Sequence, residues 1–153
     1  MSANHFLTNS RASPPIGPSQ RWSSAYSSGQ CWDWDGLSTH AHEGDVVWIS
    51  VLHADWKDKI SALVQGAVPL YVVVLSPLPY DAEGLRAIHL GAHGYCHLYA
   101  VPELMQEVGR AVQTGALWVG PELVGRIASA TRTLLHQHSQ NAAVVPSVDL
   151  SVL

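Results

Sequence analysis

Apolar, β-branched runs alternate with amphipathic segments through the middle of this chain, and this alternation constrains its fold more than any other feature. Residues 45–52 (DVVWISVL) and 71–75 (YVVVL) have the composition of strands that are covered on both faces. Residues 56–67 place apolar side chains at the spacing of a helix, among them Ile60, Leu63 and Val64. Strands that alternate with helices predict a parallel sheet with helices on both faces.

The second half of the chain continues the same pattern. Asp81 is placed to cap a helix that Gly91 closes, and residues 94–99 predict a short strand. Pro102 then suits the first position of a helix with one apolar face. The alternation therefore extends over at least three strands and three helices.

Two short apolar segments upstream, residues 5–8 and 30–34, supply two further strands. In the second of these, the alternation of Trp32 and Trp34 with aspartates predicts both indole rings on one side of a strand. Five strands and five helices predict an α/β, flavodoxin-like, doubly wound fold. Ligands of such folds lie at the carboxyl ends of the strands, near the switch point of the sheet.

The remaining segments set the predicted boundaries. Residues 11–30 are rich in Pro and Ser and predict a loop or a short irregular helix. We expect a domain over 1–118, a linker helix over 119–138 and a flexible tail over 139–153. The predicted linker helix either packs on its own domain or dimerises through four apolar residues, Leu123, Ile127, Ala130 and Leu134.

Composition excludes several classes of protein. Only 13% of the 153 residues are charged and the formal net charge is -4, which argues against both a disordered polyelectrolyte and direct, phosphate-driven DNA binding. No apolar run is long enough to span a bilayer and no signal peptide precedes the domain, so we expect a cytoplasmic protein. The two distant cysteines, Cys31 and Cys96, fit reduced thiols.

One stretch of the chain resembles a known family. The segment GAHGYCHLYAVPELMQEVGRAV, at residues 91–112, and LWVGPEL, at 117–123, are similar to the receiver domains of response regulators, in particular the LuxR-type (NarL/FixJ) branch. The resemblance extends more loosely back to about residue 5. It implies the CheY-like form of the doubly wound fold, a (βα)5 domain followed by a linker helix.

The resemblance also implies that the phosphorylation site is degenerate. The position of the phosphate-accepting Asp falls on Ser50, the acid pair that holds Mg²⁺ falls near Asn9 and Ser10, and the phosphate-pairing Lys falls on Leu98. Acyl phosphate formation needs an ionised carboxylate, and a magnesium site needs anionic oxygen ligands. We therefore expect no metal and no phosphorylation at this site.

Two further positions of the family pattern are retained. Ser76 occupies the position of the switch Ser/Thr and Tyr95 that of the switch aromatic residue. In a working receiver these residues report phosphorylation; here an equally strong interpretation is a strand-end serine and a half-buried tyrosine. Asp55, five positions beyond Ser50, is the alternative candidate for a displaced acceptor.

Other candidate sites are weaker. His89, His93 and His97 recur every four residues, but glycines interrupt the helix that a zinc site would need, so we expect no metal there. Trp22 and Trp56 flank the expected phosphate pocket, and we hypothesise that large apolar side chains partly fill or cover it. The chain carries no hydrolase, P-loop or dinucleotide motif, so we expect neither an enzyme nor a cofactor.

These expectations combine into one functional prediction. The chain is predicted to be a phosphorylation-independent receiver domain that acts as a regulatory and dimerisation module of a transcriptional regulator. Four residues of the last two domain helices form the predicted homodimer face: Arg86, His89, Glu103 and Arg110. The resemblance implies that DNA is bound only through a helix-turn-helix domain that would follow, and a regulatory protein partner is a further expectation. The alternative is a ligand-sensing domain that binds a small molecule in the altered pocket.

Overall fold

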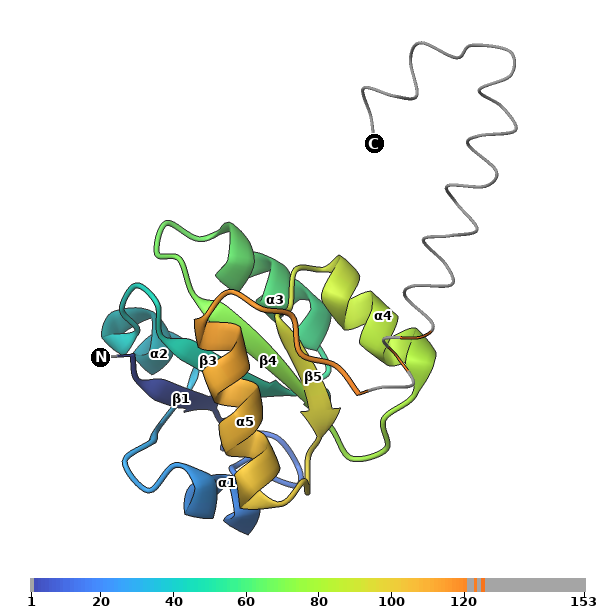
Figure 1. Cartoon of the computed structure of the whole chain (residues 1–153). Helices are drawn as coiled ribbons and strands as arrows, with labels where there is room; N and C mark the ends of the chain where they lie inside the picture. Colours follow the sequence, from blue (N-terminus) through green and yellow to red (C-terminus); the bar gives the residue numbers. More distant parts are fainter. Residues whose placement is uncertain (1, 121–122, 124, 126–153) are drawn as a thin grey trace, which may run out of the picture. The chain divides into compact units, whose positions relative to one another are not determined.

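Five parallel strands form one sheet in the order β2-β1-β3-β4-β5 (Figure 1), which confirms the predicted fold class. The computed structural model describes residues 2–120, 123 and 125. The strands are β1 (Asn4–Leu7), β2 (Gln30–Trp32), β3 (Val46–Ser50), β4 (Tyr71–Ser76) and β5 (Gly94–His97). The helices that follow them in turn are α1 (Gln20–Ala25), α2 (Trp34–His40), α3 (Trp56–Gln65), α4 (Asp81–His89) and α5 (Pro102–Gln113).

The central strands are buried on both faces, as their uninterrupted apolar sequences predict. Every second residue of β3 and β4, for example Trp48 and Val73, joins one large buried cluster with Phe6 and Met105. The residues between them, such as Ile49, are buried outside that cluster and so face the opposite side of the sheet.

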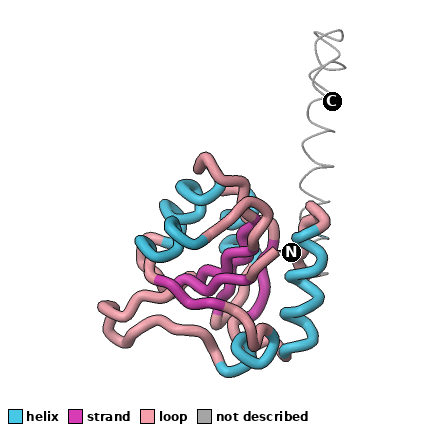
Figure 2. The backbone as a smooth tube through the Cα atoms, turned by 90° about the vertical axis from the view of Figure 1, so that its left-hand side faces the viewer, coloured by secondary structure: helices cyan, strands magenta, loops and turns pink. Residues whose placement is uncertain are grey.

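The helices form two layers. Helices α1 and α5 cover one face of the sheet, and α2, α3 and α4 cover the other (Figures 1 and 2). Two hydrogen bonds join α5 to the end of α1. The Tyr26 hydroxyl donates to the carbonyl of Met105 at 2.8 Å, and the Gln106 amide donates to the carbonyl of Ala25 at 3.1 Å.

The outer edge of β5 is occupied by the chain that follows α5. Trp118 forms a parallel bridge with Gly94, because its N–H donates to the carbonyl of His93 at 2.9 Å and its carbonyl accepts the N–H of Tyr95 at 3.1 Å. The Trp118 side chain also packs against the large buried cluster. This edge of the sheet is therefore covered by the chain itself.

A buried polar network closes the amino-terminal edge of the sheet. His5 Nε2 lies 2.8 Å from Oδ2 of Asp45, and His5 Nδ1 accepts the indole N–H of Trp32 at 3.0 Å. The Asp45 carboxylate also accepts the N–H groups of Ala3 and His42. Burial alone would raise the pKa of the Asp45 carboxyl, but these hydrogen bonds outweigh it and lower the pKa below its usual value.

Two local predictions are wrong. Trp34 does not continue the strand with Trp32, because Asp33 caps α2 through a 2.8 Å hydrogen bond from the N–H of Gly36 and Trp34 begins that helix. Asp81 does not cap α4 either. The cap residue is Tyr80, which makes no side-chain cap hydrogen bond, and Asp81 is an acidic residue of the first helical turn.

The chain divides into two compact units, Met1–Gly120 and Pro121–Leu153. All the elements above belong to the first unit. The predicted linker helix over 119–138, with Ile127, Ala130 and Leu134, and the predicted tail over 139–153 lie outside the described residues, apart from positions 119, 120, 123 and 125. Within the described part of the chain, no helix is long and apolar enough to cross a membrane.

Candidate functional site

The predicted site residues meet at the carboxyl edge of the sheet because the strands that carry them are parallel. Ser50 ends β3 and pairs with Leu75 of β4, and Ser76 ends β4 and pairs with His97 of β5. Asn9 lies two positions beyond the end of β1. The tertiary structure thus brings the ends of β1, β3, β4 and β5 to one edge of the domain.

Ser50 is fully buried, and its hydroxyl forms a hydrogen bond with the backbone. Its Oγ accepts the N–H of Leu52 at 3.0 Å, and its carbonyl accepts the N–H of His53 at 3.2 Å. These bonds turn the chain from β3 toward α3. The strand end therefore presents a turn-forming hydroxyl and no carboxylate.

Ser76 and Tyr95 lie together. Ser76 Oγ accepts the N–H of Leu78 at 3.3 Å, and it also interacts with the Tyr95 hydroxyl. That hydroxyl lies 2.7 Å from Oε1 of Glu83 and accepts the N–H of Tyr80 at 3.0 Å. Burial, reinforced by the Glu83 carboxylate, raises the pKa of Tyr95 well above its usual value, so the hydroxyl keeps its proton and donates it.

Leu98 is a core residue. Its side chain belongs to the large buried cluster with Trp22 and Met105. Its N–H donates to the carbonyl of Ser76 at 2.8 Å, and its carbonyl accepts the hydroxyl of Ser19, which also caps α1. An alkyl side chain thus packs where the resemblance places an ammonium group.

The end of β1 opens on a polar cavity. Asn9 pairs with Ile16 in an antiparallel bridge, and its Oδ1 accepts the N–H of Arg11 at 3.1 Å. Asn9 and Ser10 line a cavity of about 190 Å³ together with other residues of 8–11, residues 33–35, His53 and Lys59. The cavity lies between the loops that follow β1, β2 and β3.

His53 is a candidate site residue that the sequence reasoning missed. It is buried, its Nε2 lies 3.1 Å from the carbonyl of Leu7, and its Nδ1 has no hydrogen-bond partner. Burial lowers the pKa of the ring below its usual value. The available signal was a histidine in the loop that directly follows the most buried strand.

Asp55, the candidate displaced acceptor, lies on the surface. Its side chain is 54% exposed, and its Oδ2 is 2.7 Å from Nζ of Lys59. The hydrogen bond from Lys59 is the main reason that the pKa of the Asp55 carboxyl is lowered. Asp55 is therefore ionised, but its partner is a lysine of its own helix.

The tryptophans cover only part of this edge. Trp22 is buried against Phe6 and Trp48, in the cluster that also contains Leu98. Trp56 is buried at the start of α3, with Nζ of Lys57 5.7 Å from its ring centroid. The polar cavity beside Asn9 is open, so apolar side chains do not cover the whole edge.

The recurring histidines do not converge. His89 and His97 are exposed, whereas His93 is half-buried and its Nδ1 accepts the N–H of Val72 at 3.1 Å. Among the described residues, no group of three His, Cys, Asp or Glu side chains could hold a metal ion.

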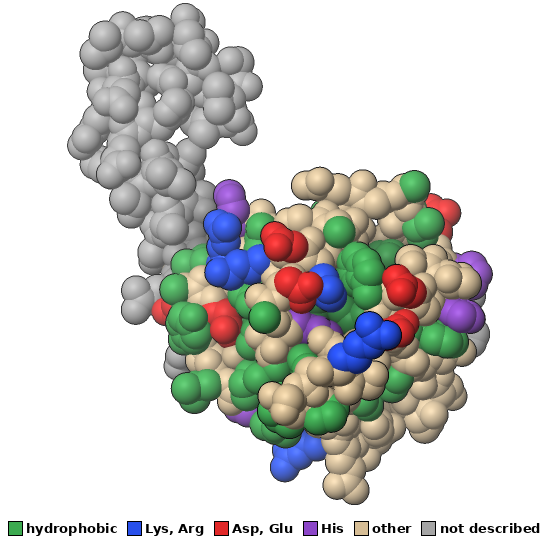
Figure 3. Space-filling model, turned by 180° about the vertical axis from the view of Figure 1, so that it is seen from behind, with side chains coloured by type: hydrophobic (Ala, Val, Ile, Leu, Met, Phe, Trp, Pro, Cys, Tyr) green, Lys and Arg blue, Asp and Glu red, His purple; other side chains and the backbone are tan. Residues whose placement is uncertain are grey.

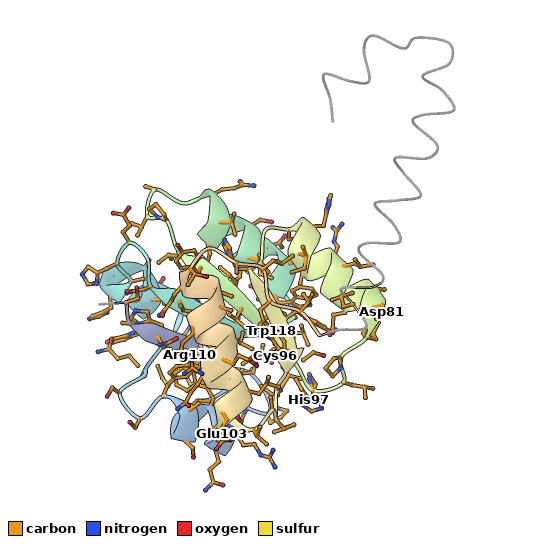
Figure 4. All side chains as sticks on the ribbon, in the orientation of Figure 1. Asp81, Cys96, His97, Glu103, Arg110 and Trp118 are labelled. Atoms are coloured by element: carbon orange, nitrogen blue, oxygen red, sulfur yellow. The ribbon has the colours of Figure 1, made fainter. Side chains whose placement is uncertain are left out.

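The four residues of the predicted dimer face are all exposed, two on α4 (Arg86, His89) and two on α5 (Glu103, Arg110). Because α4 and α5 cover opposite faces of the sheet, the two pairs lie on different faces of the domain. On α5, Arg110 lies on the side of the helix turned away from Trp118, and Glu103 lies near the start of the helix (Figure 4). Exposed large apolar side chains near the β5 edge are Leu117, which precedes Trp118, and four residues in the loops after β4 and β5: Leu78, Tyr80, Tyr99 and Val101. Seen from behind, charged side chains of both signs lie next to one another (Figure 3).

Comparison with known proteins identifies the fold. No family model and no curated protein matches the sequence. Among solved structures, a response regulator from Thermotoga maritima matches with a TM-score of 0.58 at 11% identity over 74% of this chain and 99% of that one. Response regulator DrrB of Thermotoga maritima, an OmpR/PhoB homologue, matches with a TM-score of 0.55 at 17% identity, over 76% of this chain and 55% of that one. The chain has the fold of response regulator receiver domains.

Proposed function

We propose that this chain is a phosphorylation-independent receiver domain that regulates through protein contacts. The observation that carries the proposal is the chemistry at the end of β3, where Ser50 stands in the position of an acceptor carboxylate. A buried hydroxyl that already accepts a backbone N–H is not activated as a nucleophile. A partner or a ligand then controls the regulatory state of such a domain.

The surroundings of Ser50 support the same conclusion. Asn9 and Ser10 provide no anionic ligand for Mg²⁺, and Leu98 provides no cation for a phosphoryl group. The pair of Ser76 and Tyr95 is retained, with the Tyr95 hydroxyl bonded to Glu83 of α4. In the proposed function this pair responds to contacts at α4.

Treatment with acetyl phosphate and Mg²⁺, followed by intact mass measurement, tests the proposal. We expect no added phosphoryl group, while a receiver with an intact acceptor Asp gains one in the same experiment. Beryllofluoride with Mg²⁺ should leave the amide NMR spectrum unchanged. A stoichiometric mass increase that Asp55→Asn abolishes would show that Asp55 is a displaced acceptor, and would overturn the proposal.

We further propose that the domain forms a homodimer through α4 and α5, and that it belongs to a LuxR-type transcriptional regulator. Exposed residues of opposite charge, Arg110 and Glu103, lie on α5, and apolar side chains such as Tyr99 and Val101 lie in the loop before it. Light scattering at high micromolar concentration should report twice the chain mass. Arg110→Glu should weaken the dimer, and Glu43→Lys, at an exposed residue in the loop before β3, should not. A monomer in the unmodified protein would contradict this proposal.

A further inference from the structure

The polar cavity beside Asn9 has the position of a ligand site. It lies at the carboxyl ends of β1, β2 and β3. The chain leaves β1 toward α1 on one face of the sheet and leaves β3 toward α3 on the other (Figure 1). The loops therefore diverge here, which is the switch point where doubly wound folds bind their ligands.

The cavity carries unpaired charges of both signs. Arg11 supplies a guanidinium and Asp35 a carboxylate, and within the described part of the chain neither side chain has a hydrogen-bond or ion-pair partner. Asp33 uses one oxygen to cap α2, so its second oxygen remains available. Lys59 Nζ adds a second cation, held 2.7 Å from Asp55 and 4.9 Å from the ring centroid of Trp34.

A buried acceptor also lines the cavity. His53 Nε2 faces the carbonyl of Leu7 and must carry a proton to make that 3.1 Å hydrogen bond. In the neutral ring, Nδ1 is then a bare acceptor, and it is buried with no partner. A buried polar atom without a partner is costly, so the wall of the cavity at His53 is destabilised in this structure. Nδ1 is closed to solvent, so a ligand would contact it only after the ring or its neighbours had moved.

The lining argues against three ligand classes. The cations Arg11 and Lys59 disfavour a bare divalent cation, and the aspartates disfavour a bare anion such as phosphate. The mainly polar lining disfavours an apolar molecule. A volume of about 190 Å³ is smaller than the usual pocket for a drug-sized ligand, which excludes a nucleotide.

We propose that this cavity binds a small zwitterion of the α-amino-acid class, with its carboxylate toward Arg11 and its ammonium toward Asp33 and Asp35. The inference rests on the proposed function in one respect: a signal other than phosphorylation controls the regulatory state of the domain. The binding itself is independent of dimerisation and of DNA recognition.

Amide NMR titration and calorimetry of the full chain test the proposal, with glycine, L-serine and L-aspartate as probes. We expect saturable binding of at least one of them, with the largest shifts at residues 8–11 and 33–35 and at His53 and Lys59. Acetate and ethanolamine, which each carry only one of the two charges, should bind at least tenfold more weakly, since a lost charge-assisted contact is worth about 1.5 kcal/mol or more.

Variants distinguish the site from nonspecific binding. Arg11→Gln and Asp35→Asn should each weaken binding of the same probe about tenfold or more. Asp58→Asn, which removes an exposed carboxylate of α3 outside the cavity, should not weaken it. Normal amide spectra of the variants exclude unfolding as the cause.

Four outcomes would overturn the inference. They are no binding of any amino acid probe, equal binding of inorganic phosphate, equal binding of Mg²⁺, and preferential binding of a neutral sugar such as D-ribose. None of them bears on the mass measurement with acetyl phosphate. The ligand site and the proposed function therefore fail separately.

Discussion

The hydroxyl of Tyr95 lies 2.7 Å from Oε1 of Glu83, so one side-chain hydrogen bond joins β5 to α4. The same hydroxyl accepts the N–H of Tyr80 in the loop between β4 and α4. Together these bonds hold the Tyr95 ring against the body of the domain, where it is buried. The Tyr95 hydroxyl therefore helps to hold α4 on the domain, together with the buried residues of that helix.

Removing this hydroxyl should loosen α4. Tyr95→Phe is expected to lower the free energy of unfolding by about 1–2 kcal/mol, because one hydrogen bond to a carboxylate is lost and the Tyr80 N–H loses its acceptor. Urea denaturation measures the loss, and hydrogen exchange should quicken in α4. Tyr99→Phe, at an exposed tyrosine, should change stability by less than about 0.5 kcal/mol. Equal midpoints for Tyr95→Phe and the unmodified protein would contradict this role.

Shortening Leu98 should cost core stability. Leu98→Ala is expected to lower the free energy of unfolding by about 2–4 kcal/mol, because the side chain packs with Trp22 and Met105 and its loss leaves a cavity. Leu85→Ala, on the exposed side of α4, should cost less than about 1 kcal/mol. Equilibrium unfolding in urea compares the two. Equal losses would show that Leu98 is not part of the core.

Gly109 allows α5 to approach α1. A Cβ at this position would collide with the hydroxyl of Tyr26, which donates to Met105. Gly109→Ala is therefore expected to destabilise the domain by about 1–3 kcal/mol through overpacking. Tyr26→Phe should recover part of that loss when combined with Gly109→Ala, because it removes the colliding atom. Gly17→Ala, where an added Cβ has no atom within 4 Å, should be nearly neutral. Thermal melting of the unmodified protein, Gly109→Ala, the double variant and Gly17→Ala tests these expectations.

The stability of the domain should fall in acid through Asp45. Its folded-state pKa is lower than that of the unfolded chain, about 3.9, so the unfolded state binds the proton more readily. The stabilisation is complete above the unfolded pKa and is lost as pH falls through the lowered folded pKa. Asp45→Asn should cost about 1.5–3 kcal/mol at neutral pH, and the difference should shrink in acid.

Urea midpoints measured from neutral pH down to about pH 3 test this dependence, since that range covers the unfolded pKa of an aspartate. Asp58→Asn, at an exposed carboxyl, serves as the comparison and should follow the unmodified protein. A constant gap between Asp45→Asn and the unmodified protein across this range would rule out the coupling.

The fold could be predicted from local patterns because parallel strands that are buried on both faces need continuous apolar runs. The runs at β3 and β4 and the proline that begins α5 each mark an element by its own sequence. The start of α2 was misplaced for a physical reason. The alternation of Trp32 and Trp34 suits a strand, and only the cap formed by Asp33 turns the chain into a helix.

The candidate site was predictable only in part. The positions of Ser50, Ser76 and Tyr95 follow from the ends of predicted strands, so their neighbourhood could be expected. The polar cavity could not, since it combines loops that follow three different strands. His53 was missed because its place after a buried strand is only a weak signal, and the burial of its ring with one unpartnered nitrogen depends on the tertiary structure.

The sequence by itself determined the order of strands and helices and the side chain that ends each strand, because periodicity and residue type are local properties. Only the tertiary structure decided what those side chains do. It buries Ser50 in a turn, places Leu98 in the core and leaves Arg11 and Asp35 unpaired beside one cavity. These outcomes depend on distances between segments far apart in the chain, which packing of the two helical layers on the sheet sets.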